Sequence, residues 1–169
     1  MWKVIVSALA GGSLAMGGGM MLRVRKKRLA QARKIRNLMV RIVSLALRTL
    51  SEERGGGLVS ASEAYYFIWV TERVAVRHGV DLPGFKFDVV DGALSSARLT
   101  LILRRMLADG EVRLVDSFLE PVWDARMPEL DARQEALLEK CGMIIDEVAA
   151  QWDDEAPEER LVRFGKLFK

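Results

Sequence analysis

Residues 23–53, RVRKKRLAQARKIRNLMVRIVSLALRTLSEE, contain the clearest helical pattern in the chain. Apolar side chains recur in steps of three or four residues, the period of an amphipathic helix; they are Leu29, Ala32, Ile35, Met39, Ile42, Ala46 and Leu50. Most of the cations fall on the opposite side, while Arg25, Arg28 and Arg36 fall on or beside the apolar stripe. The pattern therefore predicts one long helix with an apolar stripe and a basic back.

The cations of this helix are the candidate anionic-surface binding residues: Arg23, Arg25, Lys26, Lys27, Arg28, Arg33, Lys34, Arg41 and Arg48. On an anionic lipid surface each cation contributes on the order of 1 kcal/mol. The same cations could follow the phosphates of a nucleic acid, or form only the solvated face of a helix bundle. Since no aromatic residue interleaves them and no recognition motif accompanies them, we expect any nucleic-acid binding to be non-specific.

Residues 4–22, VIVSALAGGSLAMGGGMML, precede this helix and carry no charge over 19 positions. That length suffices to span a bilayer, and the basic cluster after it predicts an outside N-terminus and a cytoplasmic C-terminal part. Ser7, Gly11, Ala15 and Gly19 recur at every fourth position, a spacing that allows close helix packing and oligomer formation. Burial within a soluble assembly is the main alternative, and a cleaved signal peptide is a weaker one because a dense basic cluster follows.

Charge is divided unevenly along the chain. The first 50 residues hold eleven Lys or Arg and no Asp or Glu. The other 119 residues hold the remaining 15 basic residues against all 23 acidic ones, a balance of −8. This asymmetry points to an anionic partner for the N-terminal segment, whether lipid headgroups, nucleic acid or an acidic protein surface.

The composition also excludes several classes of protein. A hydrophobic share of 50% excludes a disordered tail, and a single Cys and a single His exclude a disulfide scaffold or a zinc site built from Cys and His. No nucleophile elbow, phosphate-binding loop or metalloprotease motif occurs. We therefore expect no catalytic residue, no cofactor and no small-molecule substrate. Cys141 is expected to be a buried hydrophobe, and His78 to cap a helix.

The remainder of the chain is predicted to be helical. Helices are expected from Ser60, with a capping box to Glu63, up to Gly79; from about 87 to 108; from 111, interrupted at Pro121; from about 130 to 152; and from Pro157 to the end. The predicted fold class is all-α, with an N-terminal transmembrane-like helix, a long basic helix and a C-terminal bundle. The predicted divisions are an anchor over 1–22, the basic helix over 23–54, a glycine-rich linker over 55–59 and a helical domain over 60–169.

The order of these elements resembles that of the LLH-type phage holins over about the first 100 residues. The likeness rests on the N-terminal apolar span, the basic helix containing Lys26 and Lys27, Gly79 with the Val-Asp-Leu turn after it, and an apolar helix from Val89. The glycine-rich span, the Gly55 to Gly57 run and residues 105–169 depart from that layout. The resemblance implies oligomers that permeabilise membranes. In layout alone, the chain is also similar to small phage ejection proteins and to membrane-associated virion subunits.

The function expected from these patterns is that of a non-enzymatic structural or assembly subunit, anchored in or associated with a membrane or a virion. It would act through helix packing and homo-oligomer formation, with anionic lipid as its partner. Two alternatives stay open. One is a holin-like permeabilising protein, and the other is a soluble assembly subunit whose basic helix contacts nucleic acid non-specifically.

Overall fold

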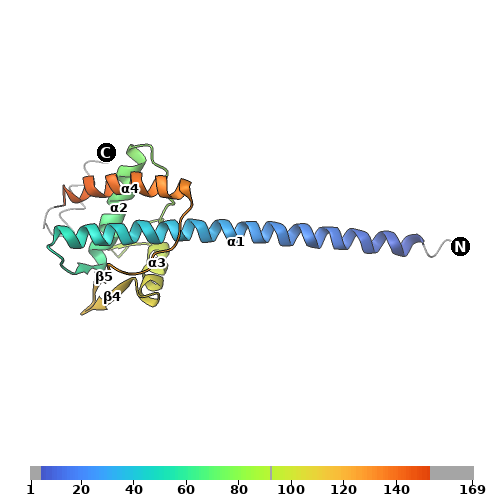
Figure 1. Cartoon of the computed structure of the whole chain (residues 1–169), viewed down its shortest axis with the longest axis horizontal. Helices are drawn as coiled ribbons and strands as arrows, with labels where there is room; N and C mark the ends of the chain where they lie inside the picture. The colour runs from blue at the N-terminus through green and yellow to red at the C-terminus, as the bar shows by residue number, and fades with distance from the viewer. Residues whose placement is uncertain (1–4, 92, 153–169) are drawn as a thin grey trace. The chain divides into compact units, whose positions relative to one another are not determined.

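The computed structural model describes residues 5–91 and 93–152, with side chains described from residue 24 onward. The described elements are α1 (Ile5–Glu53), β1 (Val59–Ser60), α2 (Ala61–Arg77), β2 (Asp88–Val90), β3 (Ala93–Ser95), α3 (Ala97–Ala108), β4 (Val112–Val115), β5 (Phe118–Pro121) and α4 (Ala132–Ala149) (Figure 1). The chain forms two compact units that divide between Arg36 and Asn37. The expected anchor and basic helices are consecutive parts of the single helix α1.

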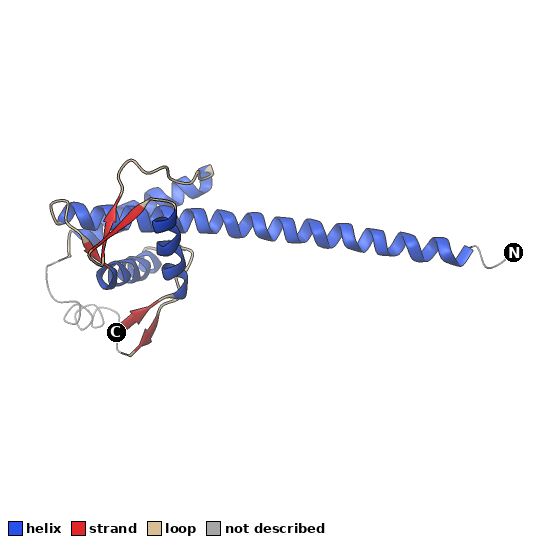
Figure 2. Cartoon of the chain, turned by 90° about the horizontal axis from the view of Figure 1, so that it is seen from below, coloured by secondary structure: helices blue, strands red, loops and turns tan. Residues whose placement is uncertain are grey.

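The predicted all-α fold is wrong, because two small antiparallel sheets accompany the four described helices (Figure 2). The fold prediction also included a transmembrane-like helix, and that part is not met. In the described part of the chain no helix is both long and apolar enough to cross a membrane.

The first error lies in the helix expected from about 87 to 108. Its first third is instead the hairpin β2 and β3, in which Val89 pairs with Leu94, and only α3 is helical. Val89 and Val90 are β-branched, and Asp91, which has a φ of 51°, begins an Asp-Gly pair typical of a two-residue hairpin turn. Ser96 then caps α3 by accepting a hydrogen bond from the Leu99 amide at 3.2 Å.

The second error lies in the helix expected from Glu111. Residues 112–121 form the hairpin β4 and β5, with Val115 opposite Phe118 and Leu114 opposite Leu119. Asp116 and Ser117 make the turn at φ values of 47° and 73°, and two consecutive positive φ values are the requirement of a type I′ hairpin turn. Strand β1 pairs with the other edge of β5, which gives the sheet order β1, β5, β4.

The folded unit from Asn37 onward surrounds one apolar core. The second half of α1 contributes many of the buried side chains, and α2 packs against α4 (Figure 1). Its largest fully buried side chains are Phe67, Phe85, Ile42, Leu47, Leu50, Ile68, Leu99, Met106 and Ile145. The second part of the expected apolar stripe, from Met39 to Leu50, is thus confirmed as core, whereas its first members, Leu29, Ala32 and Ile35, are exposed. Residues 37–53 belong to the folded unit.

The glycine run after α1 acts as a helix ending. Gly55 and Gly56 have φ values of 67° and 87°, and their amides donate to the carbonyls of Glu52 and Ser51 at 2.8 and 2.7 Å. Such left-handed residues commonly close a helix, and glycine adopts them without strain. The run therefore turns the chain from α1 into β1, where a flexible linker was expected.

The expected N-cap of α2 at Ser60 is confirmed, as one half of the predicted capping box. The Ser60 hydroxyl accepts a hydrogen bond from the Glu63 amide at 3.2 Å, and His78 is the C-cap residue. The carboxylate of Glu63, however, is buried and forms an ion pair with Arg54 at 2.5 Å. The Trp152 indole N–H also donates to it at 3.3 Å, so one carboxylate connects the end of α1, the start of α2 and the segment after α4.

Candidate anionic-surface binding site

Residues 24–36 of α1 form the candidate site. Every residue in this stretch is exposed, and seven of the thirteen are cationic; they are Arg25, Lys26, Lys27, Arg28, Arg33, Lys34 and Arg36. No Asp or Glu occurs in the first 50 residues, so no acidic side chain of the same segment neutralises them. The result is two clusters of positive charge on one helix, residues 25–28 and residues 33–36, separated by one uncharged turn.

The apolar residues of this stretch are placed unevenly around the helix. At about 100° per residue, Val24 and Ile35 lie on one face, about 20° apart, whereas Leu29, which is 62% exposed, lies about 120–140° away from both. The side chains of Val24 and Ile35 are 43% and 40% exposed. Arg28 lies on the same face, so it would extend its charged end past the two apolar side chains, as long cationic side chains do at an interface. We call residues 24–36 the cationic segment, and the side of the helix that carries Val24 and Ile35 its apolar face.

Two pairs of cations border the apolar face. Lys27 and Lys34 lie on one side of it, and Arg25 and Arg36 lie on the other, each within about 100° of its centre. Two further cations, Lys26 and Arg33, lie on the opposite side of the helix. An apolar centre with basic flanks is the arrangement by which a helix rests on an anionic membrane surface. The opposite pair provides a natural internal control.

The structure separates Arg41 and Arg48 from the other predicted binding residues. Both lie in the folded unit, and the Arg41 guanidinium forms an ion pair with Glu135 of α4 at 3.9 Å. Arg48 donates to the carbonyl of Val122 at 3.0 Å, and its guanidinium lies 5.4 Å from the centre of the Trp123 ring. These two cations therefore connect α1 to other parts of its own fold.

The remaining predicted site residues lie where only the backbone is described. Arg23 and the packing set Ser7, Gly11, Ala15 and Gly19 all belong to α1, but their side chains lie outside the described part. Helix association through this small-residue set stays a prediction. The helix expected from Pro157 also lies outside the described residues.

The two residues with reactive side chains at neutral pH are both engaged in the fold. His78 Nε2 lies 3.1 Å from a carboxylate oxygen of Glu147. Burial raises the pKa of the Cys141 thiol to about 12, which confirms the expected buried hydrophobe. Among the described residues, no group of three or more His, Cys, Asp or Glu side chains is placed to hold a metal ion.

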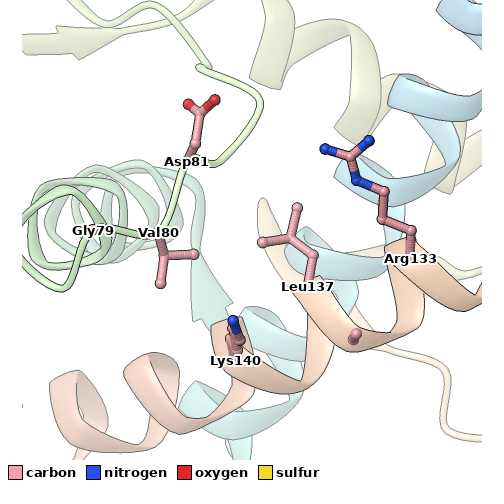
Figure 3. A pocket seen from close by; sticks show the side chains of 7 residues that line it. Gly79, Val80, Asp81, Arg133, Leu137 and Lys140 are labelled. Atoms are coloured by element: carbon pink, nitrogen blue, oxygen red, sulfur yellow. The ribbon is translucent and has the colours of Figure 1, made fainter.

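Sequence reasoning missed one feature of the folded unit. A pocket lies between the turn after α2 and the exposed face of α4, and Asp81, Arg133 and Lys140 are among its lining residues (Figure 3). The spacing of Arg133 and Lys140, seven residues apart in a helix, could have indicated two cations on one face. Their relation to Asp81 depends on the packing of α2 against α4, which no local pattern reveals.

Comparisons with protein-family models, with curated proteins and with solved structures find no match to this chain. The functional argument therefore rests on the geometry of the described residues.

Proposed function

We propose that this protein is a non-enzymatic, membrane-associated assembly subunit that binds anionic lipid headgroups through residues 24–36. The folded unit from Asn37 onward would be the part that is held at the membrane. The observation that carries the proposal is the exposure of seven cations together with Val24 and Ile35 on one helical segment.

The physical argument combines two contributions. Each Lys or Arg near an anionic leaflet contributes about 1 kcal/mol, and the leaflet's potential extends only about one Debye length from the surface. Exposed apolar side chains add affinity when they enter the boundary between headgroups and acyl chains. The apolar face with its flanking pairs supplies both contributions in one orientation.

The distribution of cations favours lipid over nucleic acid as the partner. Non-specific binding to a duplex rests on contacts between cations and phosphates, and these contacts gain nothing from exposed valine and isoleucine beside the cations. A membrane surface accommodates the apolar centre and attracts the flanking cations at the same time. Val24 and Ile35 therefore distinguish the two partners.

The proposal of a binding rather than a catalytic role has its own support. Cys141 is the single cysteine of the chain, and its thiol is buried with a raised pKa. It is therefore a poor nucleophile for the common hydrolytic mechanisms.

The test is co-sedimentation of the full chain with vesicles of phosphatidylcholine, with and without about one-third phosphatidylserine. We expect binding to the anionic vesicles that falls steeply as salt is raised, because screening weakens the interaction of exposed charges. Replacing one cation from each side of the apolar face, Arg25→Gln with Lys27→Gln, should weaken binding about 25-fold, the equivalent of about 2 kcal/mol.

The matched control is Lys26→Gln with Arg33→Gln, which removes the same charge and the same residue types from the opposite side of the helix. We expect this pair to weaken binding only about threefold, since those cations lie farther from the surface but still within a Debye length. Equal losses for the two pairs would contradict the oriented helix. Tighter binding to duplex DNA than to anionic vesicles at the same salt would replace lipid by nucleic acid as the partner.

A further inference from the structure

The pocket between α2 and α4 lies in the folded unit and is separate from the cationic segment. Its volume is about 350 Å³, near the lower end of the range for small-molecule sites. The turn after α2 forms one wall with Val80 and Asp81, and α4 forms the other with Arg133 and Leu137 (Figure 3). Lys140 lies between the two walls in the same view.

Two cations on α4 face this pocket. Arg133 and Lys140 are seven residues apart, so they lie on one side of α4, about two turns or 10.5 Å apart along its axis. Neither forms an ion pair within the part of the chain that the structure describes. Two of the four acids of α4 pair elsewhere, Glu135 with Arg41 and Glu147 with His78, and neither Glu139 nor Asp146 is among the residues that line the pocket. The positive charge of Arg133 and Lys140 is therefore left available to a ligand.

The opposite wall carries a negative charge. Asp81 is exposed and lines the pocket across from Arg133 (Figure 3). The apolar contribution comes from Val80 and Leu137, which lie on facing walls, below Asp81 and Arg133 and above Lys140 in the view of Figure 3. The pocket thus offers two cations, one anion and an apolar surface between them.

We propose that this pocket binds a small acidic α-amino compound, that is, a ligand with two carboxylates and one ammonium group, such as an acidic amino acid or a short acidic peptide. The charges of such a ligand complement those of the pocket one for one. Its carboxylates would contact Arg133 and Lys140, its ammonium would contact Asp81, and its methylene groups would pack on Val80 and Leu137. Charge-assisted hydrogen bonds to a guanidinium are especially suited to a carboxylate.

The test is a titration of the ¹⁵N-labelled full chain with L-glutamate, followed by NMR. We expect amide shifts concentrated at residues 79–81 and 133–140. Two related compounds serve as probes of the individual contacts. Glutarate keeps both carboxylates but lacks the ammonium, and 4-aminobutyrate keeps the ammonium but lacks one carboxylate. Each should bind about fivefold more weakly than glutamate, the effect expected for losing one partly exposed charged contact.

Variants assign the contacts. Lys140→Gln and Arg133→Gln should each weaken glutamate binding about fivefold, whereas Asp81→Asn should abolish the preference for glutamate over glutarate. Arg104→Gln, an exposed cation on α3 outside the pocket, is the matched control and should leave binding unchanged. All four residues are exposed, so we expect every variant to fold.

Two results would overturn the proposal. One is the absence of shifts at residues 79–81 and 133–140 with glutamate up to about 50 mM, far above the millimolar range of weak ligands. The other is a response that Arg104→Gln weakens as much as Lys140→Gln, which would indicate general attraction of anions to a basic protein. Because the cationic segment lies outside the pocket, failure of the lipid-binding proposal would not affect this outcome.

Discussion

The ion pair between Arg54 and Glu63 leads to the most informative stability prediction. The Glu63 side chain is only 4% exposed, whereas that of Arg54 is 34% exposed and lies 2.5 Å from it. Replacing Arg54 by methionine keeps most of the apolar stem but leaves a buried carboxylate without its cation. Removal of one partner from a fully buried pair typically costs about 3–5 kcal/mol.

We expect a smaller loss of stability than this for Arg54→Met, for two reasons. Arg54 is partly exposed, so solvent already screens the pair. Glu63 also keeps the hydrogen bond from Trp152 and its place in the first turn of α2, where the helix dipole favours an anion. We therefore expect Arg54→Met to lower the free energy of unfolding by about 2 kcal/mol, and the melting temperature by about 4–8 °C.

The assay is urea and thermal unfolding of the full chain, followed by tryptophan fluorescence. Trp152 reports directly on this region because its indole contacts both Glu63 and the ring of Phe67, whose centre lies 4.9 Å away. The decisive measurement is a double-mutant cycle with Glu63→Gln. In that background, where no buried charge remains, Arg54→Met should cost about 1 kcal/mol less than it does in the wild type.

The control is Arg104→Met, a change of the same kind at an exposed position of α3, which should alter stability by less than about 0.5 kcal/mol. An equal cost of Arg54→Met with and without the Glu63 carboxylate would refute the reasoning. The arginine would then act through its apolar stem alone.

Two further predictions concern Arg48 and Glu111. Arg48→Met should lower the free energy of unfolding by about 2–3 kcal/mol, because it removes the hydrogen bond to Val122 and the contact with Trp123, yet leave vesicle binding unchanged; a loss of vesicle binding at unchanged stability would return Arg48 to the binding site. Burial, with a smaller contribution from Asp109, raises the pKa of the Glu111 carboxyl above its ordinary value. Its protonated form is favoured by folding, so the stabilising contribution is complete below the unfolded-state pKa and is lost as pH rises through the folded-state pKa. Glu111→Gln should therefore gain stability relative to the wild type between about pH 4 and pH 7 in urea unfolding, and an identical pH dependence of the two proteins would contradict this assignment.

The two hairpins show where local sequence patterns were insufficient to predict the secondary structure. The segments around Asp91 and around Asp116 with Ser117 carry ordinary hairpin signals, but their apolar residues also fit a helical spacing over a short window. Helix and strand periods are hard to separate over so few residues, and the long flanking helices favoured the wrong choice. The hairpin turn residues were the better evidence, because few residues accept a positive φ.

The candidate site shows the same limit of local sequence patterns. Arg25, Arg28 and Arg41 belong to one helical pattern and carry the same charge, so composition and periodicity treat them alike. Only the packing of α4 against α1 places an acid, Glu135, beside Arg41. Partners that are distant in sequence have no signature within the segment itself.

The sequence alone determined the features that depend on neighbours along the chain: the long helix through residues 23–53, the cap at Ser60, the buried stripe that includes Cys141 and the concentration of cations before residue 37. Each follows from helical periodicity, from a side chain that can reach its own backbone, or from a local excess of charge. Tertiary structure alone decided which cations face solvent and which pair within the fold, and how Asp81 comes to lie across from Arg133. Those outcomes arise because burial and ion pairing depend on contacts between segments that are far apart in the chain, and these contacts are set by how the whole core packs.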